Sequence, residues 1–258
     1  MGVRRLCRPI FARDFAGPLS SRVIRRDLRP ARATRVDGLT EGNVDKSVGH
    51  AARILFIGNS FTARNDLPGM VAALAAARGI SVAHELITAG GASLRRHWNK
   101  GDARARIERA DLTHVVLQEQ STLPIKNPVR FHQNVGEFAP VVAASGATLV
   151  LYQTWARRHA PETQAQLSRS YAEIGREVGG LIVPAGDAWA RFLAQHASPV
   201  LHTRDGSHPT PAGSYLAACC FFCTLFGDTP PDIPLSVDAP ARHALARTAA
   251  HIVRDRQP

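Results

Sequence analysis

From residue 53 onward, short apolar runs alternate with stretches of helical periodicity. Five runs predict strands, at 54–57, 80–87, 113–118, 147–154 and 181–186. Helical patterns occupy 67–79, 93–110, 129–146, 161–180, 188–196 and 211–226. The strand runs are mostly apolar throughout, which is typical of strands covered on both faces. We therefore expect an α/β fold, a three-layer α/β/α sandwich around a mainly parallel sheet of about five strands.

Two details of the helical segments carry further expectations. Pro140 interrupts the pattern at 129–146, so we expect a kink or a split there. The last segment contains Cys219, Cys220 and Cys223, but no second group of ligands accompanies them at a metal-binding spacing. Because cysteine is among the most buried residue types, we expect these three to pack in the core.

Residues 1–52 show no such periodicity. They hold 11 Lys/Arg and 5 Asp/Glu and are rich in Pro and Gly, which predicts a flexible basic leader before a domain at 53–258. Arg4 and Arg5 are reminiscent of a twin-arginine signal, but charged residues and Pro9 interrupt the apolar segment that should follow. The pattern slightly favours the cytoplasm and leaves secretion open. No apolar run approaches the roughly 18 residues of a membrane span.

The net charge of +11 raises the question of nucleic acid. The basic residues are mainly Arg and are scattered along the chain, which is typical of a solvated surface rather than a phosphate-binding track. We therefore expect no nucleic-acid partner. The 11 histidines lack paired spacing and no H-E-x-x-H motif occurs, so we expect neither a metal nor another cofactor. The oligomeric state stays open.

Candidate chemistry lies in the loops that follow the predicted strands. The first strand runs into Gly-Asn-Ser, which places the hydroxyl of Ser60 beyond its carboxyl end, where parallel sheets form their sites. A late loop carries Asp205 and His208 three residues apart. An imidazole can take the proton of a serine hydroxyl, and a carboxylate can fix the imidazole tautomer. Taken alone, the Asp-Gly turn and the His-Pro helix start fit a capping role equally well.

Two other loops offer groups for a developing negative charge. Gly90 and Gly91 follow the second strand, and adjacent glycines let backbone N–H groups approach a ligand closely. Gln118 ends the third predicted strand and Gln120 lies in the loop after it; both carry amide donors. By itself, the Gly-Gly loop fits an ordinary turn between a strand and a helix. The glutamine loop by itself fits ordinary polar residues on the surface.

The order of the four loops is more informative than any one of them. The motifs GNSFT, AGGAS, LQEQS and DGSH, spread over residues 53–226, resemble those of the SGNH (GDSL-type) hydrolase superfamily. The likeness is closest to an uncharacterised branch with GNSFT, GGASL, LQEQS and DGSHP motifs. This resemblance implies a flavodoxin-like α/β/α fold and esterase or lipase activity. It also implies Ser60 as nucleophile, His208 as base, Asp205 as its partner, and the N–H groups of Ser60 and Gly91 as oxyanion donors.

The chain departs from the family pattern at two places. Asn59 stands where the family usually has Asp, at a position outside the triad. The third oxyanion donor of the family is usually Asn, and no Asn lies in the loop after the third strand. Carbohydrate acetylesterase branches use a Gln there, so Gln118 or Gln120 is the candidate. Gln118 sits where those branches place their Gln, and Gln120 where a Gly-x-x-Asn pattern would place its Asn.

Four further residues near these loops are candidates for the substrate pocket, each with a structural role as the alternative: Asn59, His97, Trp155 and His202. Together, the candidate residues and the resemblance to SGNH hydrolases lead us to expect a metal-independent serine esterase. Its expected substrates are small short-chain acyl esters, with O-acetylated carbohydrates preferred. An acyltransferase or thioesterase with the same triad, and a catalytically inactive SGNH-like binding protein, are the alternatives.

Overall fold

The computed structural model describes residues 51–234 and 237–256. The predicted basic leader lies outside the described residues except for Ala51 and Ala52, which begin the first strand.

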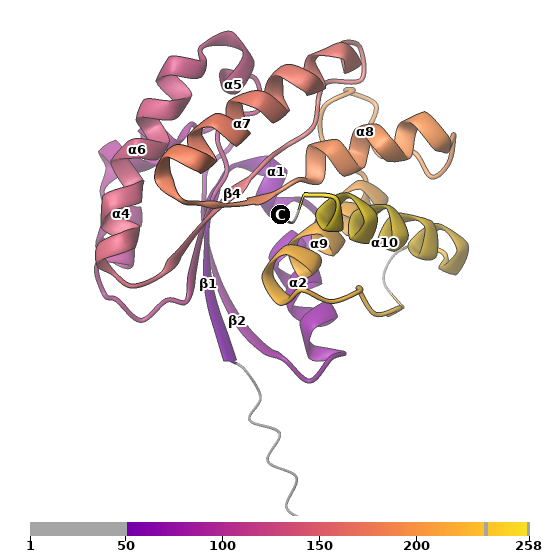
Figure 1. Cartoon of the computed structure of the whole chain (residues 1–258), viewed down its shortest axis with the longest axis horizontal. Helices are drawn as coiled ribbons and strands as arrows, with labels where there is room; N and C mark the ends of the chain where they lie inside the picture. The colour runs from indigo at the N-terminus through magenta and orange to yellow at the C-terminus, as the bar shows by residue number, and fades with distance from the viewer. Residues whose placement is uncertain (1–50, 235–236, 257–258) are drawn as a thin grey trace, which may run out of the picture. The chain divides into compact units, whose positions relative to one another are not determined.

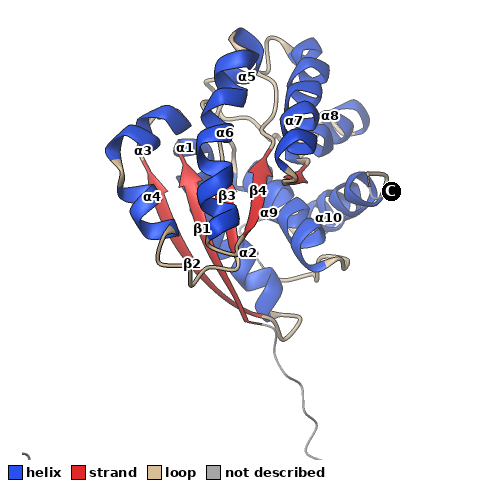
Figure 2. Ribbon diagram, turned by 60° about the vertical axis from the view of Figure 1, so that its left-hand side comes forward, coloured by secondary structure: helices blue, strands red, loops and turns tan. Residues whose placement is uncertain are grey.

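The core of the fold is a five-stranded sheet with the strand order β2-β1-β3-β4-β5, in which every pairing is parallel (Figure 2). The strands are β1 (Ala51–Gly58), β2 (Ser81–Thr88), β3 (His114–Leu117), β4 (Thr148–Tyr152) and β5 (Leu181–Val183). All five predicted strands are present, and the parallel sheet is confirmed.

The helices before β4 are α1 (Ser60–Ala63), the 3-10 helix η1 (Arg64–Asp66), α2 (Leu67–Ala76), α3 (Leu94–Lys100), α4 (Asp102–Ile107), α5 (Leu123–Lys126) and α6 (Pro128–Ala144). The helices after β4 are the 3-10 helix η2 (Pro161–Thr163), α7 (Gln164–Val178), α8 (Ala185–Gln195), α9 (Pro211–Phe226) and α10 (Ala239–Arg254).

Helices cover both faces of the sheet, which gives the predicted three layers (Figure 1). One apolar cluster joins α2, α8, α9 and α10 to the sheet face that carries Ile54 and Phe56. A second cluster joins α3, α4, α6 and α7 to the face that carries Leu55 and Ile57. Because successive strand residues point to opposite faces, a strand buried on both sides must be apolar throughout. This explains the unbroken Ile-Leu-Phe-Ile run that precedes Ser60.

Apart from the short helices α1 and α5, which the sequence pattern did not predict, the structure differs from the expected longer elements at three places. Gly101, with φ +86°, divides the predicted helix at 93–110 into α3 and α4. Pro140 does not split its segment, because α6 continues through it. Helix α10, which the sequence pattern did not predict, packs on α8 and α9. Its first turn is capped by Asp238, whose Oδ1 accepts a hydrogen bond from Ala241 N at 2.9 Å.

The three cysteines of α9 are buried, as expected. Burial raises the pKa of the Cys223 thiol to about 12, so this residue is an uncharged part of the core. Within the part of the chain that the structure describes, no helix is both long enough and apolar enough to cross a bilayer.

Candidate active site

Ser60 stands at the point where β1 turns into α1. Asn59 has an extended backbone, and its Oδ1 accepts a hydrogen bond from Phe61 N at 3.0 Å, so it caps the short helix that Ser60 begins. The Asn59 side chain is buried and points into the protein, whereas Ser60 is partly exposed. The Gly-Asn-Ser turn therefore holds the Ser60 hydroxyl at the carboxyl edge of the sheet.

His208 meets Ser60 across this edge, although 148 residues separate them in the sequence. Ser60 Oγ lies 2.9 Å from His208 Nε2, and His208 Nδ1 lies 2.6 Å from Asp205 Oδ2. A carboxylate can only accept, so Nδ1 carries the proton that it donates to Asp205. The lone pair of Nε2 is then directed at the Ser60 hydroxyl. The structure thus brings together the three residues that the sequence predicted as a triad.

The loop that carries Asp205 and His208 is organised by the carboxylate itself. Asp205 Oδ1 accepts hydrogen bonds from Thr203 Oγ1 and Ser207 N, both at 2.8 Å, and from His208 N at 3.0 Å. The loop is closed by Thr203 N, which donates to the His208 carbonyl at 2.8 Å. One oxygen of Asp205 therefore shapes the turn while the other orients the imidazole.

These hydrogen bonds keep Asp205 ionised. The contact with the His208 side chain, followed by the backbone N–H of His208, holds the pKa of the Asp205 carboxyl well below its usual range. The side chains of His208 and Asp205 are 24% and 47% exposed. The triad side chains accordingly lie at an open surface that water can reach.

The Gly-Gly loop is fastened beside Ser60. Asn59 Nδ2 donates to the carbonyl of Ala92 at 3.0 Å, and Ala89 N donates to the carbonyl of Gly58 at 3.4 Å. Gly91 has φ +63°, a conformation that favours glycine. Among the hydrogen bonds of the described residues, none uses the backbone N–H of Ser60 or of Gly91. Both groups are free to donate to a ligand.

The two glutamines differ in what their side chains already bind. Gln118 is fully buried; its Oε1 accepts from Asn59 N at 2.9 Å and from Thr62 Oγ1 at 3.0 Å, and its Nε2 donates to the Glu119 carbonyl. Gln120 is partly buried, and its Oε1 accepts from the backbone N–H groups of Thr122 and Leu123 at 2.9 and 3.0 Å. The Nε2 of Gln120 has no partner among the described residues, so its amide is oriented and unused.

The four candidate pocket residues lie beneath this surface rather than on it. Asn59, His97, Trp155 and His202 are all buried. His97 Nε2 lies 2.7 Å from the Gly58 carbonyl, and His202 Nε2 lies 3.1 Å from the Ala156 carbonyl. Burial lowers the pKa of both imidazoles. The four residues support the loops from below, and His202 also lines a small cavity of about 60 Å³ together with Arg157 and Trp189.

Trp155 illustrates this supporting role. It stacks on Trp189 with ring centroids 3.7 Å apart and on Phe61 at 5.1 Å, and its Nε1 donates to the Ser207 carbonyl at 2.9 Å. The ring of Phe61 in turn lies 5.3 Å from the imidazole of His208. Trp155 therefore reaches the triad through Phe61 and through the residue that precedes His208.

Glu119 is a buried part of the site that the sequence did not single out. Its Oε1 accepts from Leu94 N at 3.1 Å and Gln120 N at 2.6 Å, and its Oε2 accepts from Asn134 Nδ2 at 2.8 Å. Burial nonetheless raises the pKa of the Glu119 carboxyl. The contact with Leu94 joins the loop after β3 to the helix that follows the Gly-Gly loop. The sequence signal that could have identified Glu119 is its position between two glutamines directly after a predicted strand.

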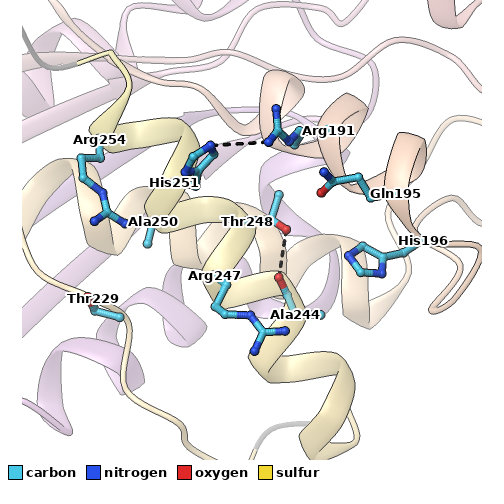
Figure 3. A pocket seen from close by; sticks show the side chains of 10 residues that line it. All are labelled: Arg191, Gln195, His196, Thr229, Ala244, Arg247, Thr248, Ala250, His251 and Arg254. Atoms are coloured by element: carbon cyan, nitrogen blue, oxygen red, sulfur yellow. Dashed lines mark hydrogen bonds between the residues drawn. The ribbon is translucent and has the colours of Figure 1, made fainter.

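Other parts of the described structure offer less chemistry. Among residues 51–234 and 237–256, no group of three or more His, Cys, Asp or Glu is arranged to hold a metal ion. A cavity of about 500 Å³ lies between α8 and α10, where arginines and histidines gather without a serine, a cysteine or a carboxylate (Figure 3). This cavity, which we call the α8/α10 groove, contains no triad residue and no nucleophile with a base.

Comparison with known proteins places the fold and the site in context. A scan against models of protein families and a search of curated proteins gave no match. Among solved structures, a Bacteroides uniformis protein of the DUF4886 family has a TM-score of 0.66 at 20% identity, covering 79% of this chain and 95% of its own. A variant of Axe2, an acetyl xylan esterase from Geobacillus stearothermophilus, has a TM-score of 0.55 at 18% identity, covering 71% and 99%.

A protein from Slackia heliotrinireducens that is classed with the SGNH hydrolases is more similar in sequence. It is 30% identical, with a TM-score of 0.57 over 68% of this chain and 100% of its own. This likeness spans the whole of that protein and agrees with the parallel sheet. The chain belongs to the SGNH hydrolase superfamily.

Proposed function

We propose that this chain is a serine esterase that hydrolyses short-chain acyl esters through Ser60, His208 and Asp205. The observation that carries the proposal is the continuous set of contacts from Ser60 Oγ to His208 Nε2, at 2.9 Å, and from His208 Nδ1 to Asp205 Oδ2, at 2.6 Å. A hydroxyl, an imidazole and a carboxylate in this order form the arrangement that activates a serine for acyl transfer.

In the first half of the reaction, Ser60 Oγ attacks the ester carbonyl while its proton passes to His208 Nε2. The new imidazolium is stabilised by the Asp205 carboxylate. When the tetrahedral intermediate collapses, the bond between carbon and the leaving oxygen breaks, and Nε2 returns the proton to the leaving alcohol. The product of this half is an ester of the acyl group with Ser60.

The negative charge of the intermediate needs donors that are already oriented. The backbone N–H groups of Ser60 and Gly91 are unused in the described structure, and both lie in loops held by Asn59. We assign the third donor to the Nε2 of Gln120, because its Oε1 is fixed by backbone N–H groups and its amide is free. Gln118 is fully buried and already engaged, which argues against this role.

In the second half, water takes the place of the alcohol and frees the acid. The exposure of His208 and Asp205 favours water as the second nucleophile, because an acyltransferase must keep water away from its acyl-enzyme. For the substrate class we propose short acyl groups, with O-acetylated carbohydrates preferred. The likeness to Axe2, whose name records acetyl xylan esterase activity, and the Gln in the oxyanion loop support this choice.

The test is hydrolysis of 4-nitrophenyl acetate by the wild type, Ser60→Ala and a control, Ser145→Ala, at the far end of α6. We expect Ser60→Ala to lose roughly 10⁴–10⁶-fold in kcat and Ser145→Ala to match the wild type. A fluorophosphonate probe should label the wild type at Ser60 and leave Ser60→Ala unlabelled. Undiminished turnover in Ser60→Ala would refute this nucleophile. An inert, unlabelled wild type would instead indicate a binding protein.

A further inference from the structure

Arg157 lies beside the triad without any role in the mechanism described above. It follows β4, so it emerges at the same carboxyl edge of the sheet as Ser60. Its guanidinium carbon lies 5.6 Å from the centroid of the Phe61 ring, and its Nη2 donates to Ser121 Oγ at 2.9 Å. Phe61 contacts the imidazole of His208, and Ser121 adjoins Gln120. Arg157 therefore touches neighbours of both the base and the assigned oxyanion donor.

The charge of Arg157 has no ionic partner within the protein. Among the described residues, no carboxylate lies within 4.0 Å of this guanidinium. Partial burial lowers the pKa of Arg157, while the field of Asp205 acts in the opposite direction. Asp205 forms no ion pair with it, because its two oxygens are committed to His208 and to the turn. A half-buried cation in this state is incompletely compensated.

Other arginines of the molecule show how unusual this is. The side chain of Arg106 is only 11% exposed, and Glu85 and Asp111 contact it at 2.5 and 2.6 Å. The arginines of the α8/α10 groove in Figure 3 are exposed, so water solvates their charges. The charge of Arg157 is compensated in neither way. The side chain is only partly solvated, and its hydrogen-bonding partner is a neutral hydroxyl.

We propose that Arg157 binds an anionic group of the ester, so that the enzyme selects substrates that carry a carboxylate near the scissile bond. This inference rests on the proposed function and narrows its substrate class. The guanidinium presents a planar set of donors, of which the described contacts use one. A carboxylate can accept two parallel hydrogen bonds from such a group. Burial beside an aromatic ring strengthens the interaction, because less water competes for the charge.

The carboxylate has two possible positions, and two substrate pairs distinguish them. For the acyl side, 4-nitrophenyl hemisuccinate is compared with 4-nitrophenyl butyrate, which has the same leaving group. For the alcohol side, 4-acetoxybenzoate is compared with its methyl ester. In each pair we measure kcat/KM for the anionic and the neutral ester. The anionic-to-neutral ratio of kcat/KM is then compared between each variant and the wild type.

We expect Arg157→Gln to lower this ratio about 10- to 100-fold in one of the two pairs, mainly through KM, as for loss of a charged hydrogen bond. Arg157→Lys should recover part of the loss. The control Arg169→Gln, at an exposed position of α7, should keep the wild-type ratio. If Arg157→Gln slows the anionic and neutral esters by the same factor in both pairs, Arg157 only positions Phe61 and the inference is wrong.

Binding to Ser60→Ala separates this inference from the proposed function. Calorimetry should show 4-nitrophenyl hemisuccinate or 4-acetoxybenzoate binding more tightly than its neutral partner, and the preference should vanish in Ser60→Ala with Arg157→Gln. If that preference exists while the wild type hydrolyses neither ester, the esterase proposal fails and the anion site stands. If the wild type hydrolyses all four esters and Arg157→Gln leaves both ratios unchanged, the esterase stands and the anion site is refuted.

Discussion

Two layers of polar residues meet at the carboxyl edge of the sheet, and the LQEQS motif contributes residues to both. The upper layer contains Ser60, His208 and Gln120, which are partly exposed and reach toward solvent. The lower layer contains Gln118 and Glu119, which are fully buried and bound to backbone groups of the loops. The upper layer has unused hydrogen-bonding groups. Nearly all hydrogen-bonding groups of the lower layer are engaged in contacts that hold the loops.

The contacts of the lower layer explain how the loops that carry Ser60 and Gln120 are held in place. The lower layer links the loops after β1, β2 and β3: Gln118 binds Asn59, and Glu119 binds Leu94 and Gln120. A buried polar group is costly when it is unpaired, so each of these contacts fixes a loop position strongly. We therefore expect changes in the upper layer to remove activity and spare stability. Changes in the lower layer should mainly reduce the stability of the fold.

The largest effect is expected for His208→Ala. Without the base, the Ser60 proton has no acceptor, and we expect kcat for 4-nitrophenyl acetate to fall roughly 10⁴–10⁶-fold. Because the imidazole is partly exposed, the melting temperature should change by no more than about 2 °C. A collapse of stability in this variant would contradict the division between the layers. Parallel thermal melts and activity assays make the comparison.

An intermediate effect separates the two glutamines. Gln120→Ala should lower kcat by about 10²–10³-fold, as for loss of one oxyanion donor. Gln118→Ala leaves Asn59 N and Thr62 Oγ1 without their buried acceptor, which should cost about 1–3 kcal/mol per unsatisfied group. Its main signature is therefore a lower urea midpoint. The opposite pattern, with Gln118→Ala stable and inactive, would transfer the oxyanion role to Gln118.

The smallest effect concerns the pH dependence of stability in Glu119→Gln. Burial raises the folded-state pKa of Glu119 above its ordinary value of 4.5, so the folded protein binds a proton more readily than the unfolded chain. As the pH falls through this raised pKa toward about 4.5, the wild type gains stability relative to a variant that binds no proton there. Urea unfolding of both proteins at pH 7.5 and at pH 5 measures the difference. If the stability of the wild type relative to Glu119→Gln decreases between pH 7.5 and pH 5, the raised pKa of Glu119 is contradicted.

The fold was largely predictable because it depends on patterns that persist over many residues. Five apolar runs between helical segments were enough to give the parallel sheet, and the order of the motif-bearing loops gave the meeting of Ser60 with His208. The split at Gly101 was missed because one glycine at positive φ outweighs an otherwise continuous helical pattern. Helix α10 was missed because its buried face consists mainly of Ala and Thr, with Leu245 and Val253 as its larger apolar side chains.

The depth of each side chain at the site was harder to predict. Strand periodicity ends where the loops begin, so nothing local indicates whether a loop residue points outward or inward. Asn59 and Ser60 are neighbours and face opposite ways, and Trp155 is covered by packing from Trp189, which is distant in the sequence. The unpaired charge of Arg157 is likewise a property of the surrounding fold rather than of its own segment.

The stacked indoles of Trp155 and Trp189 have an optical consequence. The chain has three tryptophans, and two of them form this pair. The N–H of Trp155 donates a hydrogen bond to the carbonyl of Ser207, the residue directly before His208. Any shift of that segment when a substrate enters must alter the electronic surroundings of the pair. Native emission and near-ultraviolet dichroism therefore give a label-free signal from the reactive edge itself.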